Sequence, residues 1–367
     1  MNSLLAGGVA IGVSCLLLWL LRPLALRIGL VDQPGERKRH NGNVALIGGI
    51  AMFCGLVFSV LMLDASLAGY RSFFAAATLL IIVGILDDFH ELPTWSRFAA
   101  QFVAALIMSI SGGVFVNDLG AITGGAAVEL NIWAIPFTIF ATIGVINAWN
   151  MSDGLDGLAG GLALVAFLLL GIVALSAGRY TDGQLLFLLV AVVGTFLLFN
   201  MRFPRRKQAL VFMGDAGSMF LGFTLAWFAI SLSQGENRAM TPVTALWILA
   251  LPLIDAVSIL LRRMYTKRPP FSAATDHMHH ILLQLGCGVN ATVGSIVGSA
   301  LALGILGLIG LYIGMSEQLL FFGFLGLFAS YLWVTTRIMK GDSSTVERVS
   351  KLGYRQKVNT PAQNIKP

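Results

Sequence analysis

Charged residues are scarce in this chain. Aspartate, glutamate, lysine and arginine make up only 11% of its 367 residues, whereas hydrophobic residues make up 57%. A soluble globular domain carries about 25% charged residues. The deficit extends over the whole length, so it excludes a soluble protein and leaves no room for a separate soluble domain. The formal net charge of +6 does not indicate nucleic-acid binding, because basic residues in a membrane protein report its topology.

Cysteine is scarce as well. The three cysteines are Cys15, Cys54 and Cys287, two of them in apolar runs, and no two have the spacing of metal ligands. This number and spacing exclude a disulfide framework. We interpret all three as packing residues.

Apolar runs are abundant, and they are typically about 20 residues long, which is the length that a helix needs to cross a membrane. A spanning backbone must satisfy its own hydrogen bonds, so we expect every span to be helical. The sequence therefore predicts an all-α polytopic membrane protein with about eleven spans. The segment 95–114 contains Arg97 and Gln101, and without it every later span would be inverted. The predicted spans are 2–21, 44–63, 72–86, 95–114, 130–149, 158–177, 184–200, 212–232, 241–261, 292–313 and 318–336.

The basic residues predict the orientation of these spans. The connections after odd-numbered spans and the C-terminal tail together hold 21 of the 24 lysines and arginines. This asymmetry predicts that these connections and the C-terminus are cytoplasmic and that the N-terminus is periplasmic. The basic residues near the first span follow its apolar run, so we expect a retained anchor and no cleaved signal peptide. The other side holds Arg71, Arg179 and Arg238.

The chain is expected to form one catalytic unit. We predict a single transmembrane catalytic domain over residues 1–340, with cytoplasmic active-site loops, and a basic cytoplasmic tail over residues 341–367 near anionic head groups. No internal repeat is evident, which disfavours the inverted-repeat transporter folds.

Histidines and clustered acids gather on the predicted cytoplasmic side. The topology rests on lysine and arginine alone, so this clustering is independent information, and it indicates an acidic, metal-type reaction site facing the cytoplasm. Acids on the other side are scattered singly. The gathered residues are His40, His90, His277, His279, His280, Asp87, Asp88, Asp153, Asp156, Asp215 and Asp276.

Asp87 and Asp88 are adjacent carboxylates at a predicted helix end. They repel each other unless a cation or a basic group is near. Neighbouring side chains diverge on a helix, so we expect the two to contact different partners. A solvated helix end is the alternative.

Asn150, Asp153 and Asp156 recur at every third residue, so they line one face of a helical turn. The interleaved glycines allow backbone to approach a ligand closely. The alternative is that Asp153 or Asp156 caps the next span.

Asp215 lies between glycines where a predicted span begins, beside the basic run 205–207. The N-terminus of a helix favours phosphate, and Mg²⁺ is typically held by one or two carboxylates together with substrate phosphates. The alternative is a simple N-cap.

Histidines follow Asp276 in the order His277, His279, His280, a few residues after Arg268. Histidines with an aspartate can bind zinc, but no fourth ligand is evident. The neighbouring basic residues favour contact with phosphate or pyrophosphate instead.

Two features allow two interpretations each. Arg37 and Lys38 belong to a basic run at a membrane boundary, which is either a topology signal or a site for an anionic lipid head group. Asp255 lies inside the predicted span 241–261, where a carboxylate is either functional or paired.

Four motifs together resemble the polyprenyl-phosphate N-acetylhexosamine-1-phosphate transferase superfamily. They occur in order: Asp87-Asp88, the stretch from Asn150 to Gly157, the stretch from Phe212 to Ser218, and His277-Met-His-His280. The similarity runs from about Val31 to His280. The muramoyl-pentapeptide branch carries three consecutive histidines, whereas the His-Met-His-His pattern resembles the bacterial branch that uses UDP-N-acetylglucosamine.

The resemblance implies a reaction. N-acetylglucosamine-1-phosphate would pass from UDP-N-acetylglucosamine to undecaprenyl phosphate, giving undecaprenyl-diphosphate-N-acetylglucosamine and UMP at the bacterial inner membrane. It further implies the first lipid-linked step of enterobacterial common antigen and O-antigen lipopolysaccharide synthesis, and sensitivity to tunicamycin. The alternatives are another UDP-sugar donor, such as UDP-muramoyl-pentapeptide, and, more remotely, a transporter. Lipid-facing and partner-facing apolar surfaces look alike, so a homodimer is compatible with the sequence.

The resemblance also implies residue roles. Asp215, with Asn150, would hold Mg²⁺, or alternatively Mn²⁺. Asp87 and Asp88 would orient or deprotonate the lipid phosphate, and Asp215 would join them as a catalytic residue. We prefer one-step transfer to a two-step scheme with a covalent aspartate intermediate.

The remaining expected roles concern substrate binding. Asp153 and Asp156 would shape the nucleotide pocket, and Phe212 would stack on uracil. The sugar or diphosphate would be contacted by His277, His279, His280 and Arg268. The lipid head group would be steered by Arg37 and Lys38.

Overall fold

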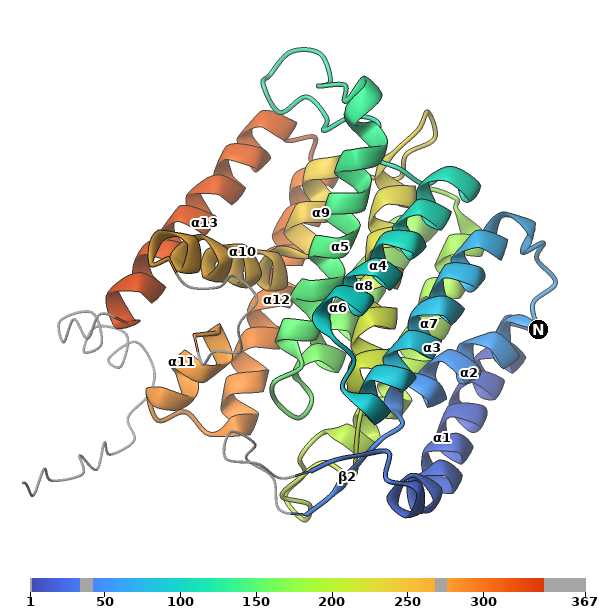
Figure 1. The fold of residues 1–367 in the computed structure, drawn as a ribbon. Helices are drawn as coiled ribbons and strands as arrows, with labels where there is room; N and C mark the ends of the chain where they lie inside the picture. The colour runs from blue at the N-terminus through green and yellow to red at the C-terminus, as the bar shows by residue number, and fades with distance from the viewer. Residues whose placement is uncertain (1, 34–41, 268–275, 340–367) are drawn as a thin grey trace, which may run out of the picture.

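The computed structural model describes residues 2–33, 42–267 and 276–339, and these form a bundle of helices (Figure 1). The predicted tail 341–367 lies outside the described residues. The helices are α1 Asn2–Ile28, α2 Gly48–Val60, α3 Arg71–His90, α4 Thr94–Leu106, α5 Ala134–Ser152, α6 Leu158–Ser176, α7 Tyr180–Asn200, α8 Gly214–Ser233, α9 Pro242–Ile248, α10 Ala250–Tyr265, α11 Met278–Gln284, α12 Val289–Tyr312 and α13 Glu317–Met339.

The helical membrane fold is confirmed, whereas the predicted span count and sidedness stay predictions. Within the described ranges, eight helices are long and apolar enough to cross a membrane, or up to nine if the bent pair α9–α10 is one span. Each of the eleven predicted segments overlaps a helix or a helix pair. However, α2 has only 13 residues. The helix α4 also has 13 residues and continues through a π-helical turn over Ile107–Ser111.

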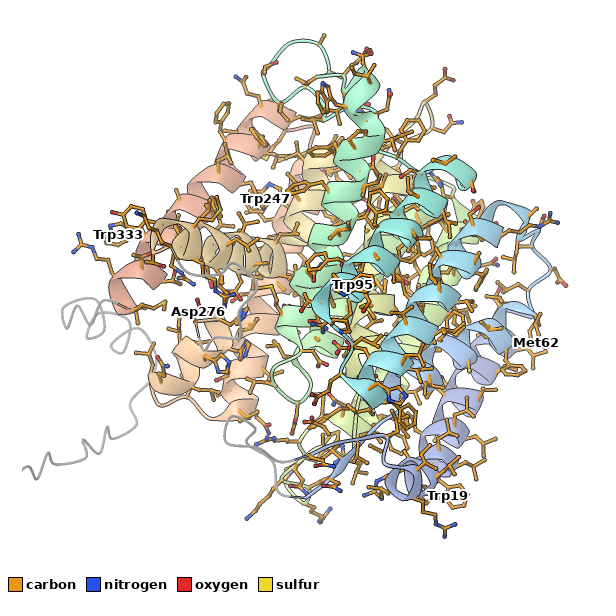
Figure 2. All side chains as sticks on the ribbon, in the orientation of Figure 1. Trp19, Met62, Trp95, Trp247, Asp276 and Trp333 are labelled. Atoms are coloured by element: carbon orange, nitrogen blue, oxygen red, sulfur yellow. The ribbon has the colours of Figure 1, made fainter. Side chains whose placement is uncertain are left out.

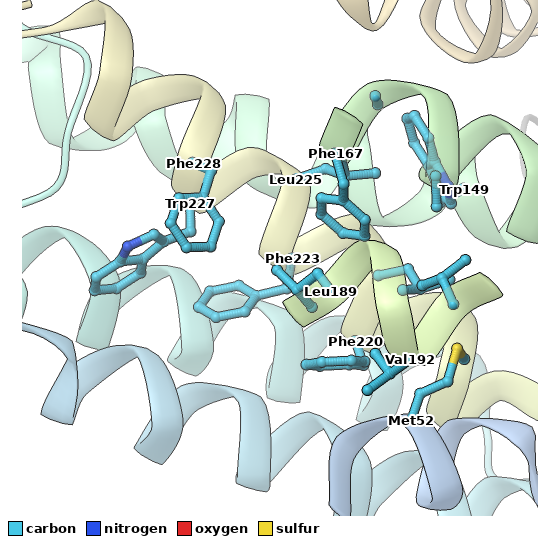
Figure 3. Close-up of a cluster of buried hydrophobic side chains, with 14 of the residues drawn as sticks. Met52, Trp149, Phe167, Leu189, Val192, Phe220, Phe223, Leu225, Trp227 and Phe228 are labelled. Carbon is cyan, nitrogen blue, oxygen red and sulfur yellow. The ribbon is translucent and has the colours of Figure 1, made fainter. Parts of the chain in front are cut away.

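The helix α8 forms the centre of the bundle. It is almost entirely buried and packs against α3, α5, α2 and α6. Its aromatic side chains Phe220, Phe223, Trp227 and Phe228 lie in the core (Figure 3). The ring of Phe73 in α3 stacks on Phe223 with centroids 6.0 Å apart. This apolar packing leaves the polar N-terminal turn of α8 at one end of the bundle.

Glycines bring two neighbouring helices close to that N-terminal turn. A Cβ atom added at Gly84 of α3 would lie 2.9 Å from Cβ of Ala216, and one at Gly49 of α2 would lie 2.6 Å from Cα of Gly217. Small residues at such crossings let helix backbones approach in a membrane bundle. The start of α8 therefore packs closely between α2 and α3.

The predicted span 241–261 is not one straight helix. The structure divides it into α9 and α10, whose axes differ by 84° across Leu249. Pro252 explains the break, because it has no N–H to donate to the carbonyl of Ile248 and its ring would clash with that carbonyl in a continuous helix. The helix α10 turns away from α9 and runs toward α13 (Figure 1).

Three very short strands, which the sequence does not predict, accompany the helices. These are β1 Val31–Asp32, β2 Val44–Leu46 and β3 Val211–Phe212, in the order β1-β2-β3. The strand β2 pairs antiparallel with β1 and parallel with β3. The segment 44–46 therefore belongs to this small sheet and not to the predicted span 44–63. The sheet places the connection after α1 beside the start of α8.

Candidate active site

Asp88 caps the N-terminus of α8. From the last turn of α3, its carboxylate accepts hydrogen bonds from the backbone N–H of Asp215 at 2.8 Å and of Ala216 at 3.4 Å. Gly214 has a φ of +72°, and a Cβ there would lie 2.9 Å from Cγ of Asp88. The predicted phosphate position at this helix start is therefore occupied in part by a carboxylate. The alternative that Asp215 is the N-cap of α8 is wrong. The N-cap residue is Met213, and its side chain makes no capping hydrogen bond.

Asp87 contacts a different set of groups from Asp88, as its position on the helix predicts. Its side chain is buried, and one oxygen accepts the N–H of Leu92 at 2.7 Å. The other oxygen lies 3.2 Å from Nη1 of Arg97, which is itself 3.5 Å from the carboxylate of Asp215. Arg97 thus bridges two of the acidic motifs.

Arg97 is the site residue that sequence reasoning missed. It lies in the first turn of α4, and its side chain is 31% exposed. In the sequence it stands out only as a polar residue in a predicted span. A signal was available, because two adjacent carboxylates require a nearby cation and Arg97 is the next basic side chain after His90.

Asn150 and Asp215 lie together, as the sequence predicts. The side-chain amide of Asn150 donates to Asp215 and also, at 2.9 Å, to the hydroxyl of Ser218. One turn earlier on α5, Asn147 donates to Gln101 of α4 at 2.7 Å. These bonds join α4, α5 and α8 beside the acidic cluster.

Asp153 lies in the turn 153–157 that joins α5 to α6, and it is partly buried. Burial, followed by the negative charges of Asp215, Asp88, Asp156 and Asp32, raises its pKa well above the ordinary value for an aspartate. The charges of carboxylates in β1, α3, α8 and this turn therefore act together on Asp153. Such a cluster favours a bound cation or a shared proton.

The residues present fit a magnesium ion. In the described part of the chain, no three histidine, cysteine or acidic side chains converge on one metal position. Mg²⁺ commonly takes only one or two protein carboxylates and completes its shell with water and substrate phosphates. Asp215, oriented by Asn150 and surrounded by further negative charge, matches that requirement.

Asp156 is engaged within the protein. Its carboxylate accepts Nε of Arg202 at 2.6 Å and the N–H of Ala209 at 3.2 Å, so it ties the turn 153–157 to the connection between α7 and α8. The alternative that Asp153 or Asp156 caps α6 is wrong, because Gly157 is the N-cap and no side chain caps it. The predicted role of Asp156 in shaping the nucleotide pocket stays a prediction.

The three histidines form one cluster around the start of α11. The rings of His277 and His279 stack with centroids 5.5 Å apart, and those of His279 and His280 lie 4.2 Å apart. His279 packs on the turn 153–157, since a Cβ at Gly154 would lie 2.8 Å from Cε1 of its ring. Burial, with His280 and His277 adding to it, lowers the pKa of His279 to about 3. His279 is therefore neutral at physiological pH.

The other predicted site residues divide into two groups. Phe212 lies in β3, three residues before Asp215, and is partly buried. Its stacking on uracil stays a prediction. Outside the described residues are Arg268, Arg37 and Lys38.

The fold and site define a multi-pass helical membrane protein with carboxylates and histidines gathered where its helices end. The model of glycosyl transferase family 4 matches residues 70–233. A relative from Yersinia pestis is 34% identical over 341 residues, which cover 91% of this chain and 93% of the relative. The chain belongs to glycosyl transferase family 4.

The similar proteins carry a common name. The Yersinia pestis relative is an undecaprenyl-phosphate alpha-N-acetylglucosaminyl 1-phosphate transferase. So is a Haemophilus influenzae relative that is 36% identical over 343 residues, covering 92% of this chain and 96% of the relative. An Escherichia coli K12 relative of that name is 36% identical over 271 residues, covering 74% of each chain.

Proposed function

We propose that this protein transfers N-acetylglucosamine-1-phosphate from UDP-N-acetylglucosamine to undecaprenyl phosphate. The products are undecaprenyl-diphosphate-N-acetylglucosamine and UMP. The observation that carries the proposal is the convergence of Asp87, Asp88, Asp153 and Asp215 with Arg97 at the ends of apolar helices. The names and coverage of the relatives support the choice of donor and acceptor.

The location of the cluster suits two substrates from different phases. Undecaprenyl phosphate reaches a helix end from the bilayer, and the nucleotide sugar arrives from the aqueous side. The basic residues of the sequence support a cytoplasmic position in the bacterial inner membrane for this end. The site is therefore at the interface where the two can meet.

The reaction needs charge control more than activation of the nucleophile. The lipid phosphate is largely ionised at neutral pH, since its second pKa is about 6. One of its oxygens attacks the β-phosphorus of the nucleotide sugar, and the bond from that phosphorus to the bridging oxygen breaks, so UMP leaves with the electron pair. The main barrier is the approach of two polyanions, which positioning and positive charge lower.

The acidic residues and Arg97 are proposed to have different roles at the reacting phosphates. Asp215, with its carboxylate oriented by Asn150, is the proposed holder of Mg²⁺, with Mn²⁺ as the alternative. When bound, the metal supplies neutralisation of phosphate charge. Arg97 adds a second positive group between Asp87 and Asp215. Asp88 fixes the first turn of α8, so it positions Asp215, while Asp87 orients the lipid phosphate through Arg97.

The histidine cluster is proposed to contact the sugar or the diphosphate. Because His279 is neutral, it acts as a hydrogen-bonding group and not as an ionic partner. His280 lies against it, and Phe212 is proposed to stack on the uracil. Arg268, Arg37 and Lys38 retain their proposed anion-binding roles.

The biological context follows from the product. A diphosphate-linked N-acetylglucosamine on undecaprenol is the first lipid-linked intermediate proposed for enterobacterial common antigen and O-antigen synthesis. Sensitivity to tunicamycin and a homodimeric assembly belong to the same proposal.

A transfer assay tests the function. Purified protein receives undecaprenyl phosphate, Mg²⁺ and UDP-N-acetylglucosamine with a labelled sugar, alongside the matched variant Asp215→Asn. The expected result is labelled lipid and released UMP in equal amounts, both lost in the variant. Label transferred only from UDP-muramoyl-pentapeptide would replace the donor and keep the chemistry. No transfer from either donor would refute the proposed function.

A further inference from the structure

The helix α10 has a polar side that faces the histidine cluster. Asp255 and Arg263 are both buried, and they are eight residues apart, so they lie on one side of the helix. In the bundle, α10 lies between α13 and the group formed by α5 and α12 (Figure 1). The 84° turn after α9 directs this side toward the start of α11.

Asp255 joins three elements through one carboxylate. Its Oδ1 accepts the hydroxyl of Tyr331 in α13 at 2.5 Å and the backbone N–H of Met278 at 3.1 Å. Its Oδ2 lies 3.0 Å from Nδ1 of His277. An ionised carboxylate only accepts hydrogen bonds, so this contact places a proton of His277 on Nδ1.

The same helix holds the residue before the histidines. Arg263 contacts Asp276 at 3.0 Å, and Arg262 donates to the Asp276 carbonyl at 2.9 Å. Figure 2 labels Asp276 between α10 and α11. Three consecutive residues, 276 to 278, are therefore bonded to α10.

Such ties are needed because α11 is short. It has seven residues, and isolated helices of that length are unstable in water. Its position against Gly154 of the turn 153–157 must therefore come from contacts with other elements.

We propose that Asp255 and Tyr331 are positioning residues that hold the His277–His280 segment against the turn 153–157. The inference rests on the proposed function and deepens it, since it adds residues from α10 and α13 that touch no substrate. The sequence left open whether Asp255 is functional or paired. In this proposal Asp255 is paired with His277 and affects the reaction only through that partner.

The test compares Asp255→Asn and Tyr331→Phe with wild type in the transfer assay. A matched control exists in Tyr70→Phe, because the Tyr70 hydroxyl donates to Asp182 at 2.5 Å beside the first residue of α3, at the end of that helix away from Asp87. The expected kcat/KM for UDP-N-acetylglucosamine falls about 10- to 100-fold for Asp255→Asn. It falls about tenfold for Tyr331→Phe, which removes one hydrogen bond to a charged group, and is unchanged for Tyr70→Phe.

The KM values for the two substrates distinguish a positioning role from general destabilisation of the protein. The loss is expected as a raised KM for UDP-N-acetylglucosamine with an unchanged KM for undecaprenyl phosphate. A purely structural role would reduce the amount of active protein and leave both KM values alone. Unchanged values, or an equal rise in both, would overturn the proposal.

Hydrogen exchange gives a readout that does not need turnover. Residues 276–284 are expected to exchange faster in Asp255→Asn and Tyr331→Phe than in wild type or Tyr70→Phe. Equal exchange in all four proteins would overturn the positioning role even if wild type is active. An inactive wild type with faster exchange in the two variants would refute the proposed function and retain the positioning role.

Discussion

Replacing Gly154 by alanine is expected to disturb the contact between the histidine cluster and the turn 153–157. The new Cβ would lie 2.8 Å from Cε1 of His279, well inside van der Waals contact. His279 is only 3% exposed, so its ring has little room to move away. Overpacking of this kind typically costs about 1–3 kcal/mol. If the strain is expressed in the transition state, the transfer rate falls about 5- to 150-fold.

Kinetics and unfolding together measure this effect. The assay is kcat/KM for UDP-N-acetylglucosamine, accompanied by the midpoint of thermal unfolding in the same detergent. The control is Gly144→Ala on α5, where an added Cβ meets nothing within 4 Å. That change is expected to leave both quantities near wild type or to stabilise the helix slightly, since alanine is a better helix former than glycine.

A double-mutant cycle identifies His279 as the cause. In a His279→Ala background the ring is absent, so Gly154→Ala is expected to cost less than about 0.5 kcal/mol of unfolding free energy. If Gly154→Ala is harmless in the native background, or equally harmful in both, the packing of His279 on the turn is refuted.

Three further predictions concern the cap, the pH and the metal. Asp88→Ala removes the hydrogen-bond acceptor at the start of α8. It is expected to lower the unfolding free energy by about 1 kcal/mol, measured by denaturation, and to abolish transfer. An unchanged unfolding free energy would contradict the capping role. His279 has a folded pKa of about 3, below its ordinary value of 6.5, so the unfolded chain gains its proton first as the pH falls. The resulting stability is present above pH 6.5 and is lost as the pH falls from 6.5 to 3, at roughly 1 kcal/mol for each pH unit; a His279→Gln variant whose stability declines equally steeply over that range would contradict this. Chelation with EDTA is expected to abolish transfer, with recovery on addition of Mg²⁺ or Mn²⁺, and full activity in EDTA would refute a metal role for Asp215.

The sequence was sufficient to predict the acidic part of the site. Asp87, Asp88, Asn150 and Asp215 lie in polar motifs that interrupt apolar runs, and the predicted topology puts these interruptions on one side. Their convergence follows from where the spans end. The partner of each carboxylate did not follow, because the capping of α8 by Asp88 depends on the register between two packed helices.

Contacts between remote segments were the least predictable. Asp255 and Tyr331 are 76 residues apart, and only the break at Pro252 directs α10 toward α13. The strands of the small sheet have two or three residues, too few for an alternating pattern to show. Arg97 is the one charged residue in the predicted span 95–114, and its contacts with Asp87 and Asp215 appear only when α3, α4 and α8 are placed together.

The close crossing at Gly84 has a consequence for how the free site responds to a cation. The backbones of α3 and α8 pack closely there, one helical turn from Asp88, so moving the two helices apart to relieve repulsion between their carboxylates would open a gap in the packed core. Packing therefore keeps these carboxylates close together. A divalent ion, if it is held there as we propose, would meet a preorganised set of oxygens, and its binding would remove the repulsion without a rearrangement of the helices.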